Sequence, residues 1–182
     1  MEKLSINNIM GGGSLGEELD LSSIAKSDWD DFNTQYDPEN FASVVLRHKN
    51  KKPTIMLFRS GKFSIAGGNS VRETKNCFNL FSSAIQDITG LKMNPNLEIR
   101  YFVTTGDLER SVNLSAVMAV LGIEEIEYEP EQFPGLFYRP KSENWFMIIF
   151  SSGSVVINGP PSIEKLESAY NKVNELLLEN NI

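Results

Sequence analysis

The chain has 182 residues, 41% of them hydrophobic, which is enough apolar material for a folded core and excludes a disordered protein. Its formal net charge of −7 argues against a nucleic-acid partner, because phosphate binding draws on clustered lysine and arginine, but a net value does not exclude one basic face. No apolar run reaches the ~20 residues of a membrane span, and the N-terminus lacks a basic segment followed by an apolar one. With Cys77 as the single cysteine, an internal disulfide is excluded, and we expect a cytoplasmic protein.

The first half of the chain predicts a strand, a short helix and three further strands. Residues 4–15 indicate the first strand, although the glycines at 11–13 weaken it. A phosphate-binding loop is the alternative there, but the Gly-Lys-Ser/Thr start of a helix is missing. The short helix begins at Leu21, with Trp29 packed beneath it. The further strands are predicted, with turns between them, at 41–47, 54–58 and 62–66.

A long helix over 71–88 follows these strands. Ser70 and Glu73 form a capping-box pattern at its start, and apolar residues then recur at spacings of three and four. Cys77 flanks this stripe and is expected to be buried.

The second half of the chain repeats the first. Residues 128–139, with the sequence YEPEQFPGLFYR, correspond to residues 36–47 at an offset of 92, and a second long helix follows the cap Ser162. We therefore predict an α+β fold with repeats at 1–92 and 93–182. The two repeats build one continuous antiparallel sheet of pseudo-twofold symmetry, with the long helices on one face. The other face stays open, and an open apolar face needs a ligand or partner.

The sequence offers no constellation for catalysis. His48, the only histidine, lies beside a turn, and we expect it to be solvated. No carboxylate cluster, no metal-binding Cys/His spacing and no nucleophile–base pair stands out. We therefore expect neither an enzyme nor a cofactor or metal.

Several motifs carry a resemblance to a known family. They are the segment 128–139, the strand and turn IIFSSG at 148–153, Asn8-Ile9, the run Leu19-Asp20-Leu21 and the weaker first-repeat copies. Over nearly its whole length the chain resembles the TATA-box-binding protein family, in particular its archaeal branch. The resemblance implies a curved, saddle-shaped sheet with the helices on the convex face. It also implies a transcription initiation factor, general or paralogous, that binds A·T-rich promoter DNA through the minor groove and bends it. The implied partners are transcription factor B and the RNA polymerase pre-initiation complex, and the implied location is the nucleoid.

The resemblance also implies roles for individual residues. Four phenylalanines would act as wedges between base pairs, where the alternative is burial in the core: Phe41, Phe58, Phe133 and Phe150. The groove floor would meet Asn8, Met10, Met56, Ser64, Val103, Ile148 and Val156. Phosphates would be contacted by four cations, which could otherwise be solvated turn residues: Arg47, Arg59, Lys62 and Arg139. Transcription factor B would meet Glu129 and Glu131.

The chain departs from the family pattern at defined positions. Tyr101 stands where the second repeat would carry an asparagine, Ser154 where it would carry a lysine, and Asn158 where it would carry a threonine. These departures support an alternative function, a saddle-shaped regulatory protein-interaction module with weakened or lost TATA binding.

Overall fold

The computed structural model describes residues 3–50 and 52–182. Its strands join in a ten-stranded sheet in the order β2-β3-β4-β5-β1-β6-β10-β9-β8-β7. The chain packs into two compact units. The N-terminal unit is Asn8–Arg100, and the C-terminal unit is the segment up to Asn7 together with Tyr101–Ile182. Strands β1 (Ser5–Ser14) and β6 (Glu98–Asp107) therefore each contribute residues to both units.

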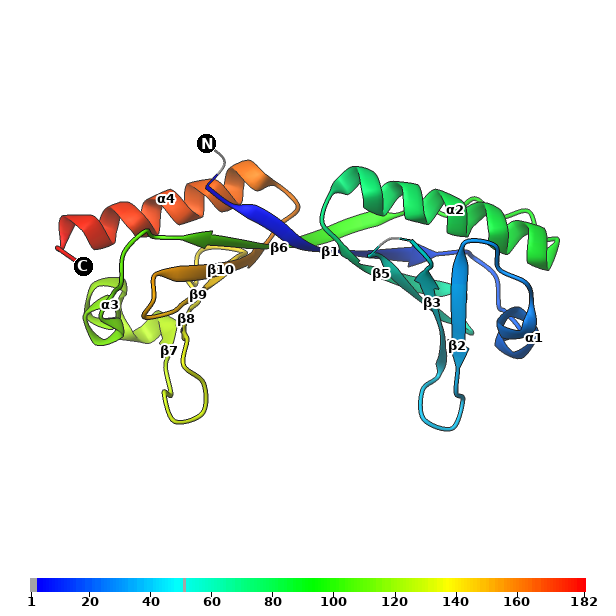
Figure 1. Cartoon of the computed structure of the whole chain (residues 1–182), viewed down its shortest axis with the longest axis horizontal. Coiled ribbons are helices and arrows are strands. Elements are labelled where there is room, and N and C mark those ends of the chain that lie inside the picture. The colour runs from blue at the N-terminus through cyan, green and yellow to red at the C-terminus, as the bar shows by residue number, and fades with distance from the viewer. Residues whose placement is uncertain (1–2, 51) are drawn as a thin grey trace. The chain divides into compact units, whose positions relative to one another are not determined.

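The N-terminal unit is an antiparallel sheet covered by helices on one face (Figure 1). After β1 the chain forms the short helix α1 and then four strands and a long helix, which are α1 (Leu21–Lys26), β2 (Phe32–Tyr36), β3 (Ser43–His48), β4 (Thr54–Phe58), β5 (Lys62–Gly68) and α2 (Val71–Thr89). The loop between β2 and β3 projects to the side away from α2 (Figure 1). The predicted strands and helices of this half are confirmed, with ends that differ by no more than a few residues.

The ends and the buried face of helix α2 follow from its sequence. The Ser70 hydroxyl accepts a hydrogen bond from the Glu73 N–H (3.2 Å), and Gly90 ends the helix in the left-handed conformation at a φ of 67°. Its buried face comprises Thr74, Cys77, Phe78, Phe81 and Ile85. The predicted stripe and the predicted burial of Cys77 are thus confirmed.

Aromatic side chains fill the core beneath α1 and α2. Trp29 stacks on Phe81 with ring centroids 6.3 Å apart, and its indole N–H donates to the Ile24 carbonyl at 3.0 Å. Phe63 stacks on Phe78 at 5.5 Å. Trp29 is therefore a core residue under the short helix, as predicted.

Two features of this unit differ from the prediction. Strand β2 was not predicted, and His48 is buried rather than solvated, with 8% of its surface exposed. The alternation of β3 continues one residue further than expected, so His48 points to the same side as the buried Val44 and Leu46. Its cross-strand neighbour is Phe32, whose ring lies edge-on at 5.4 Å, and its Nδ1 accepts from the backbone N–H two residues on.

The glycines of β1 serve close packing. A Cβ atom on Gly13 would lie 2.1 Å from the Asn96 carbonyl oxygen, and one on Gly11 would lie 2.6 Å from the Glu98 carbonyl oxygen. The backbone that leads into β6 therefore lies directly against β1, where side chains would not fit. The segment is a strand paired with β5, which also removes the phosphate-loop alternative.

The C-terminal unit repeats this arrangement (Figure 1). After β6 the elements are α3 (Leu114–Leu121), a 3₁₀ turn (Ile123–Glu125), β7 (Ile126–Glu127), β8 (Leu136–Tyr138), β9 (Phe146–Ile149), β10 (Ser154–Gly159) and α4 (Ile163–Glu179). The Ser162 hydroxyl caps α4 by accepting from the Lys165 N–H at 3.3 Å. Within residues 3–50 and 52–182, no helix combines the length and apolar character needed to cross a membrane.

Candidate nucleic-acid interface

Each unit has a sheet face that turns away from its helices, and we call it the open face. In β4 the side chains of Ile55 and Leu57 are fully buried against the helices, whereas Met56 and Phe58 between them are only half-buried. Cross-strand pairing extends this face over neighbouring strands, where Met56 lies between Val45 and Ser64.

The C-terminal unit carries the corresponding rows. Ile148 lies between Phe137 on β8 and Val156 on β10, and Asn158 lies between Phe146 and Val103. All of these side chains are half-buried. The residues expected to meet a groove floor therefore share the open face of their own unit: Met10, Met56 and Ser64 in one, and Val103, Ile148 and Val156 in the other.

Asn8 is fixed by an irregularity of the sheet. The register of β1 against β5 shifts between Ile9 and Met10, which leaves Gly67 without a partner in the ladder. The Asn8 Oδ1 accepts the Gly67 N–H at 2.7 Å. Because the carbonyl end of the amide is occupied, the NH₂ group of Asn8 is left to donate to a ligand. The corresponding residue of the other unit, Tyr101, is 48% exposed.

The four predicted wedge residues lie outside the core. Phe41 and Phe133 are 49% and 39% exposed, while Phe58 and Phe150 are half-buried. The two exposed rings sit on matching turns. The Phe41 N–H donates to the Asp37 carbonyl at 2.8 Å, and the Phe133 N–H donates to the corresponding Glu129 carbonyl at 3.0 Å. The turns therefore present both rings in the same local backbone geometry.

Among residues 3–50 and 52–182, ring-to-ring contacts on an open face are found in the C-terminal unit. Phe133 lies 5.3 Å from Phe137 and 5.9 Å from Phe150 between ring centroids. The Arg139 guanidinium lies 5.3 Å from the Phe137 ring centre and 4.4 Å from that of Phe146. Sequence reasoning missed Phe137 and Phe146. Their alternation with the buried Leu136, Tyr138 and Met147 is the signal that could have placed them on this face.

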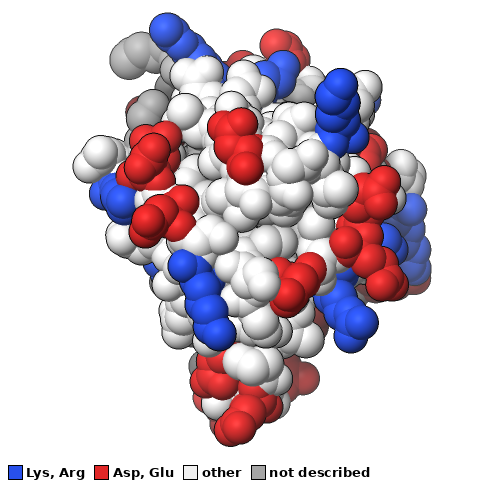
Figure 2. Space-filling model, turned by 90° about the vertical axis from the view of Figure 1, so that its right-hand side faces the viewer, with Lys and Arg blue, Asp and Glu red and all other residues white. Residues whose placement is uncertain are grey.

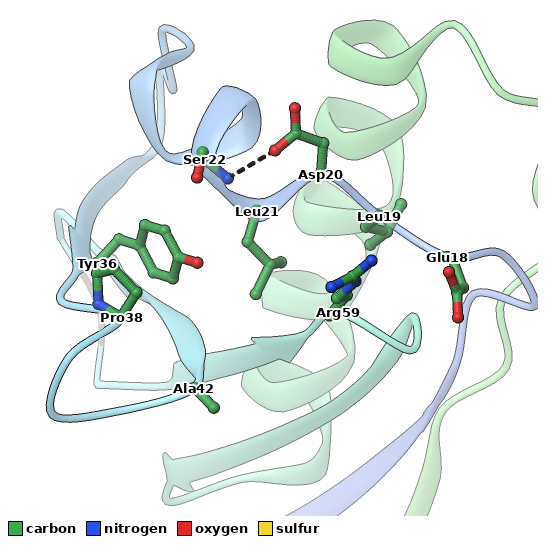
Figure 3. A pocket seen from close by; sticks show the side chains of 9 residues that line it. All are labelled: Glu18, Leu19, Asp20, Leu21, Ser22, Tyr36, Pro38, Ala42 and Arg59. Carbon is green, nitrogen blue, oxygen red and sulfur yellow. Dashed lines mark hydrogen bonds between the residues drawn. The ribbon is translucent and has the colours of Figure 1, made fainter.

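The predicted phosphate-contacting cations occupy different settings. Arg47 and Arg139 are exposed at corresponding positions on the open faces, and Lys62 is exposed at the start of β5. Arg59 instead lines a hollow of about 610 Å³ beside Glu18 and Asp20, with Leu21 and Tyr36 on its walls (Figure 3). Asp20 also caps α1, where bonds from the Ser23 hydroxyl and N–H hold the pKa of its carboxyl below the usual value.

The two units differ in charge at one edge of the open face. In the N-terminal unit Lys62 pairs across the sheet with Ser14. At the corresponding place in the C-terminal unit Ser154 pairs with Asp107, and its hydroxyl donates to the Asp107 carboxylate at 3.3 Å. A cation beside a hydroxyl in one unit is thus replaced by a hydroxyl beside a carboxylate in the other.

Acidic side chains mark the turns before the exposed phenylalanines. Figure 2 shows carboxylates gathered at the lower tip of the molecule, where the loop between β2 and β3 ends. In the C-terminal unit Glu129 accepts a hydrogen bond from the Gln132 amide, a contact that helps to close the turn. Glu131 is exposed and has no bonded partner among the described residues. In the part of the chain that the structure describes, no group of three or more His, Cys, Asp or Glu residues could hold a metal ion.

Known proteins are similar to this chain over nearly its whole length, both in sequence and in structure. Residues 3–88 and 96–180 match the family model described as "Transcription factor TFIID (or TATA-binding protein, TBP)". The TATA-box-binding protein of Picrophilus torridus is 36% identical over 175 residues, which cover 95% of this chain and 93% of that protein. That of Archaeoglobus fulgidus is 34% identical over 177 residues, with 96% and 94% covered. Among solved structures, Methanococcus jannaschii TBP superimposes with a TM-score of 0.79 at 32% identity, covering 97% of this chain and 99% of that one.

Proposed function

This chain belongs to the TATA-binding protein family, and from that premise we propose that it is a transcription initiation factor that binds A·T-rich promoter DNA through the minor groove and bends it. Its role is binding rather than catalysis. Its place of action would be the promoter, on the nucleoid within the cytoplasm.

The observation that carries this proposal is the open face itself. In both units it presents half-buried apolar side chains in corresponding rows, with an exposed phenylalanine on a turn at the end. In the minor groove A·T and T·A pairs present the same acceptors, so polar contacts there carry little sequence information. Recognition then depends on the shape of the groove, which apolar side chains can follow. Rings that stand clear of the core can enter a base step and kink the duplex, at a cost of a few kcal/mol per step.

Asn8 provides a hydrogen-bond donor on the open face. Its carbonyl oxygen is held by Gly67, so its NH₂ group is the end that remains for the DNA. Adenine N3 and thymine O2 are both acceptors, and a donor fixed in this way can meet either of them. Asn8 therefore favours A·T over G·C without distinguishing A·T from T·A.

The cations explain how a protein with a net charge of −7 can bind DNA. Arg47 and Arg139 on the open faces and Lys62 at the edge are the phosphate contacts that we propose. Arg59 is a weaker candidate, because it lies in a hollow beside Glu18 and Asp20. Few phosphate contacts predict a shallow dependence of affinity on salt.

We further propose that the turn at Glu129–Glu131 recruits transcription factor B, and through it the RNA polymerase pre-initiation complex. Glu131 is the residue available for a basic partner, since Glu129 is engaged with Gln132.

A second candidate function is a regulatory protein-interaction module with the same fold and weak DNA binding. The observation that favours it is the carboxylate of Asp107 beside Ser154, at the edge where the other unit carries Lys62. A carboxylate at a phosphate-facing edge opposes DNA binding.

An electrophoretic mobility shift separates the two functions. We expect the wild-type protein to shift an A·T-rich duplex at lower concentration than a G·C-rich duplex, and transcription factor B to shift the complex further. Arg47→Ala on the open face should weaken the shift, whereas Lys172→Ala, a matched loss of charge on α4, should not. Equal and weak binding of both duplexes would refute the initiation-factor role and support the interaction module.

A further inference from the structure

The two phenylalanine pairs differ in how their rings are held. In the C-terminal unit Phe133 contacts both Phe137 and Phe150, so its side chain is packed on two sides before any ligand binds. The corresponding residues of the N-terminal unit are Phe41, Val45 and Phe58. Valine replaces the middle ring, and no ring contact joins Phe41 and Phe58 among the described residues. Phe41 is correspondingly more exposed than Phe133, at 49% against 39%.

The two units also differ beneath the rings. A Cβ atom on Gly135 would lie 2.7 Å from a Phe133 ring carbon and 3.0 Å from a Phe150 ring carbon, which shows that both rings close over the glycine. The counterpart of Gly135 is Ser43, which is 1% exposed and whose hydroxyl has no hydrogen-bond partner among the described residues. Ser43 lies directly across the sheet from Phe58, so the N-terminal unit has a side chain where the C-terminal unit has none.

Phe137 is itself held in place. It lies on the strand β8, where its cross-strand partner is Ile148. The Arg139 guanidinium covers it at 5.3 Å and bridges to Phe146 at 4.4 Å. The N-terminal unit has Val45 and Thr54 at the places of Phe137 and Phe146, so its arginine, Arg47, has no ring to cover there.

We propose that the two wedges are not equivalent, because Phe137 is a positioning residue that holds Phe133 ready for insertion. This inference rests on the proposed function. The pair Phe133 and Phe150 is pre-organised and loses little side-chain freedom on binding, whereas Phe41 has to be ordered by the DNA. The base step under the C-terminal unit is therefore unstacked more completely than the step under the N-terminal unit. On an A·T-rich element whose two end steps differ, this difference favours one orientation of the protein.

The test uses the fluorescence of 2-aminopurine, which brightens when the base is unstacked, placed in turn at each adenine of an A·T-rich duplex. With the wild-type protein we expect two bright steps of unequal intensity. Phe41→Ala and Phe133→Ala then assign each step to one unit, because each variant should darken one of them.

The decisive variant is Phe137→Val, which introduces the residue that the first repeat has at this position. It should reduce the brightening at the step assigned by Phe133 and weaken affinity by about threefold to tenfold, the usual contribution of an aromatic pair. The other step should be unchanged, and Phe137→Tyr, which keeps the ring, should behave as the wild type. In the Phe133→Ala background Phe137→Val should have little further effect, since its role is exercised through Phe133.

Each other result overturns the inference. Equal loss at both steps, in a variant whose thermal unfolding matches that of the wild type, would mean that Phe137 does not act through Phe133. If Phe137→Val is destabilised, Phe137→Leu, which also removes the ring, takes its place with the same expected result. No loss at either step, or a full effect in the Phe133→Ala background, would mean that Phe137 does not position Phe133. If the wild-type protein brightens no step, the proposed function fails first, and the inference fails with it.

Discussion

The charge difference between the two edges leads to a quantitative prediction for salt dependence. In the N-terminal unit Lys62 lies across from Ser14, whose hydroxyl accepts the Gly16 N–H at 3.1 Å. In the C-terminal unit Ser154 lies across from Asp107, whose carboxylate accepts the Glu109 N–H at 2.7 Å. The turn has the same hydrogen bond in both units. The double variant Ser154→Lys with Asp107→Ser therefore gives the C-terminal unit the lysine and serine that the N-terminal unit has at this edge.

The magnitude follows from counterion release. One new phosphate contact steepens the log–log dependence of affinity on salt by about 0.9. Between 50 and 200 mM salt, such a contact makes the fall in affinity about 3.5-fold larger. Ser154→Lys alone should give roughly half of this change, because the new ammonium group pairs with the Asp107 carboxylate. The gain should be the same for A·T-rich and G·C-rich duplexes, since phosphate contacts carry no sequence information.

The assay is a titration of both duplexes by fluorescence anisotropy across a salt series. Glu175→Lys is the matched control, because it changes the net charge as much as the double variant but lies exposed on α4, on the helix side. An unchanged slope for the double variant would show that position 154 does not face phosphate. An equally steep slope for Glu175→Lys would show that net charge, rather than the position of the lysine, sets the salt dependence.

Four further substitutions test the partner turn, the groove contact and the packing of β1. Glu131→Lys should abolish the ternary complex with transcription factor B in a gel shift while leaving binary DNA binding intact. Glu129→Lys should also weaken DNA binding, because its carboxylate closes the turn that carries a wedge; equal behaviour of the two variants would contradict this division. Asn8→Asp keeps the acceptor for Gly67 but loses the donor, so affinity for A·T-rich duplexes should fall about 5- to 100-fold, and an unchanged affinity would remove Asn8 from the interface. Gly13→Ala should lower the free energy of unfolding by about 1–3 kcal/mol, measured in urea, because its Cβ would meet backbone at 2.1 Å; Ser5→Ala on the same strand is the control, and a neutral Gly13→Ala would mean that the adjoining chain can move away.

Much of the fold could be predicted from patterns that are local in the sequence. The stripe of α2 shows in its period and its cap, and the repeat of 36–47 at 128–139 shows that both halves share one arrangement. Strand β2 was missed because its sequence, FNTQY, buries only Phe32 and lacks a clear apolar alternation. His48 was misjudged because its burial depends on how far β3 extends along β2, which is a tertiary property.

The candidate site was predictable to a similar extent. Strand alternation is enough to place Met56 and Ile148 on the open face, and the repeat relates them to each other. The hydrogen bond from Gly67 to Asn8 depends on a register shift that no sequence pattern marks. The packing of Phe137 against Phe133 depends on the path of a turn, and it became visible only in three dimensions.

If the open face bends DNA by inserting phenylalanine rings, the bend itself can be measured. Energy transfer between dyes at the two ends of an A·T-rich duplex reports this bend. We expect the wild-type protein to bring the ends closer. The double variant Phe133→Ala with Phe150→Ala should largely abolish the change while keeping the unfolding transition, since neither ring lies in the core. Leu178→Ala, which truncates an exposed side chain on α4, should bend DNA as the wild type does. A folded double variant that bends the duplex as fully as the wild type would show that these rings do not produce the bend.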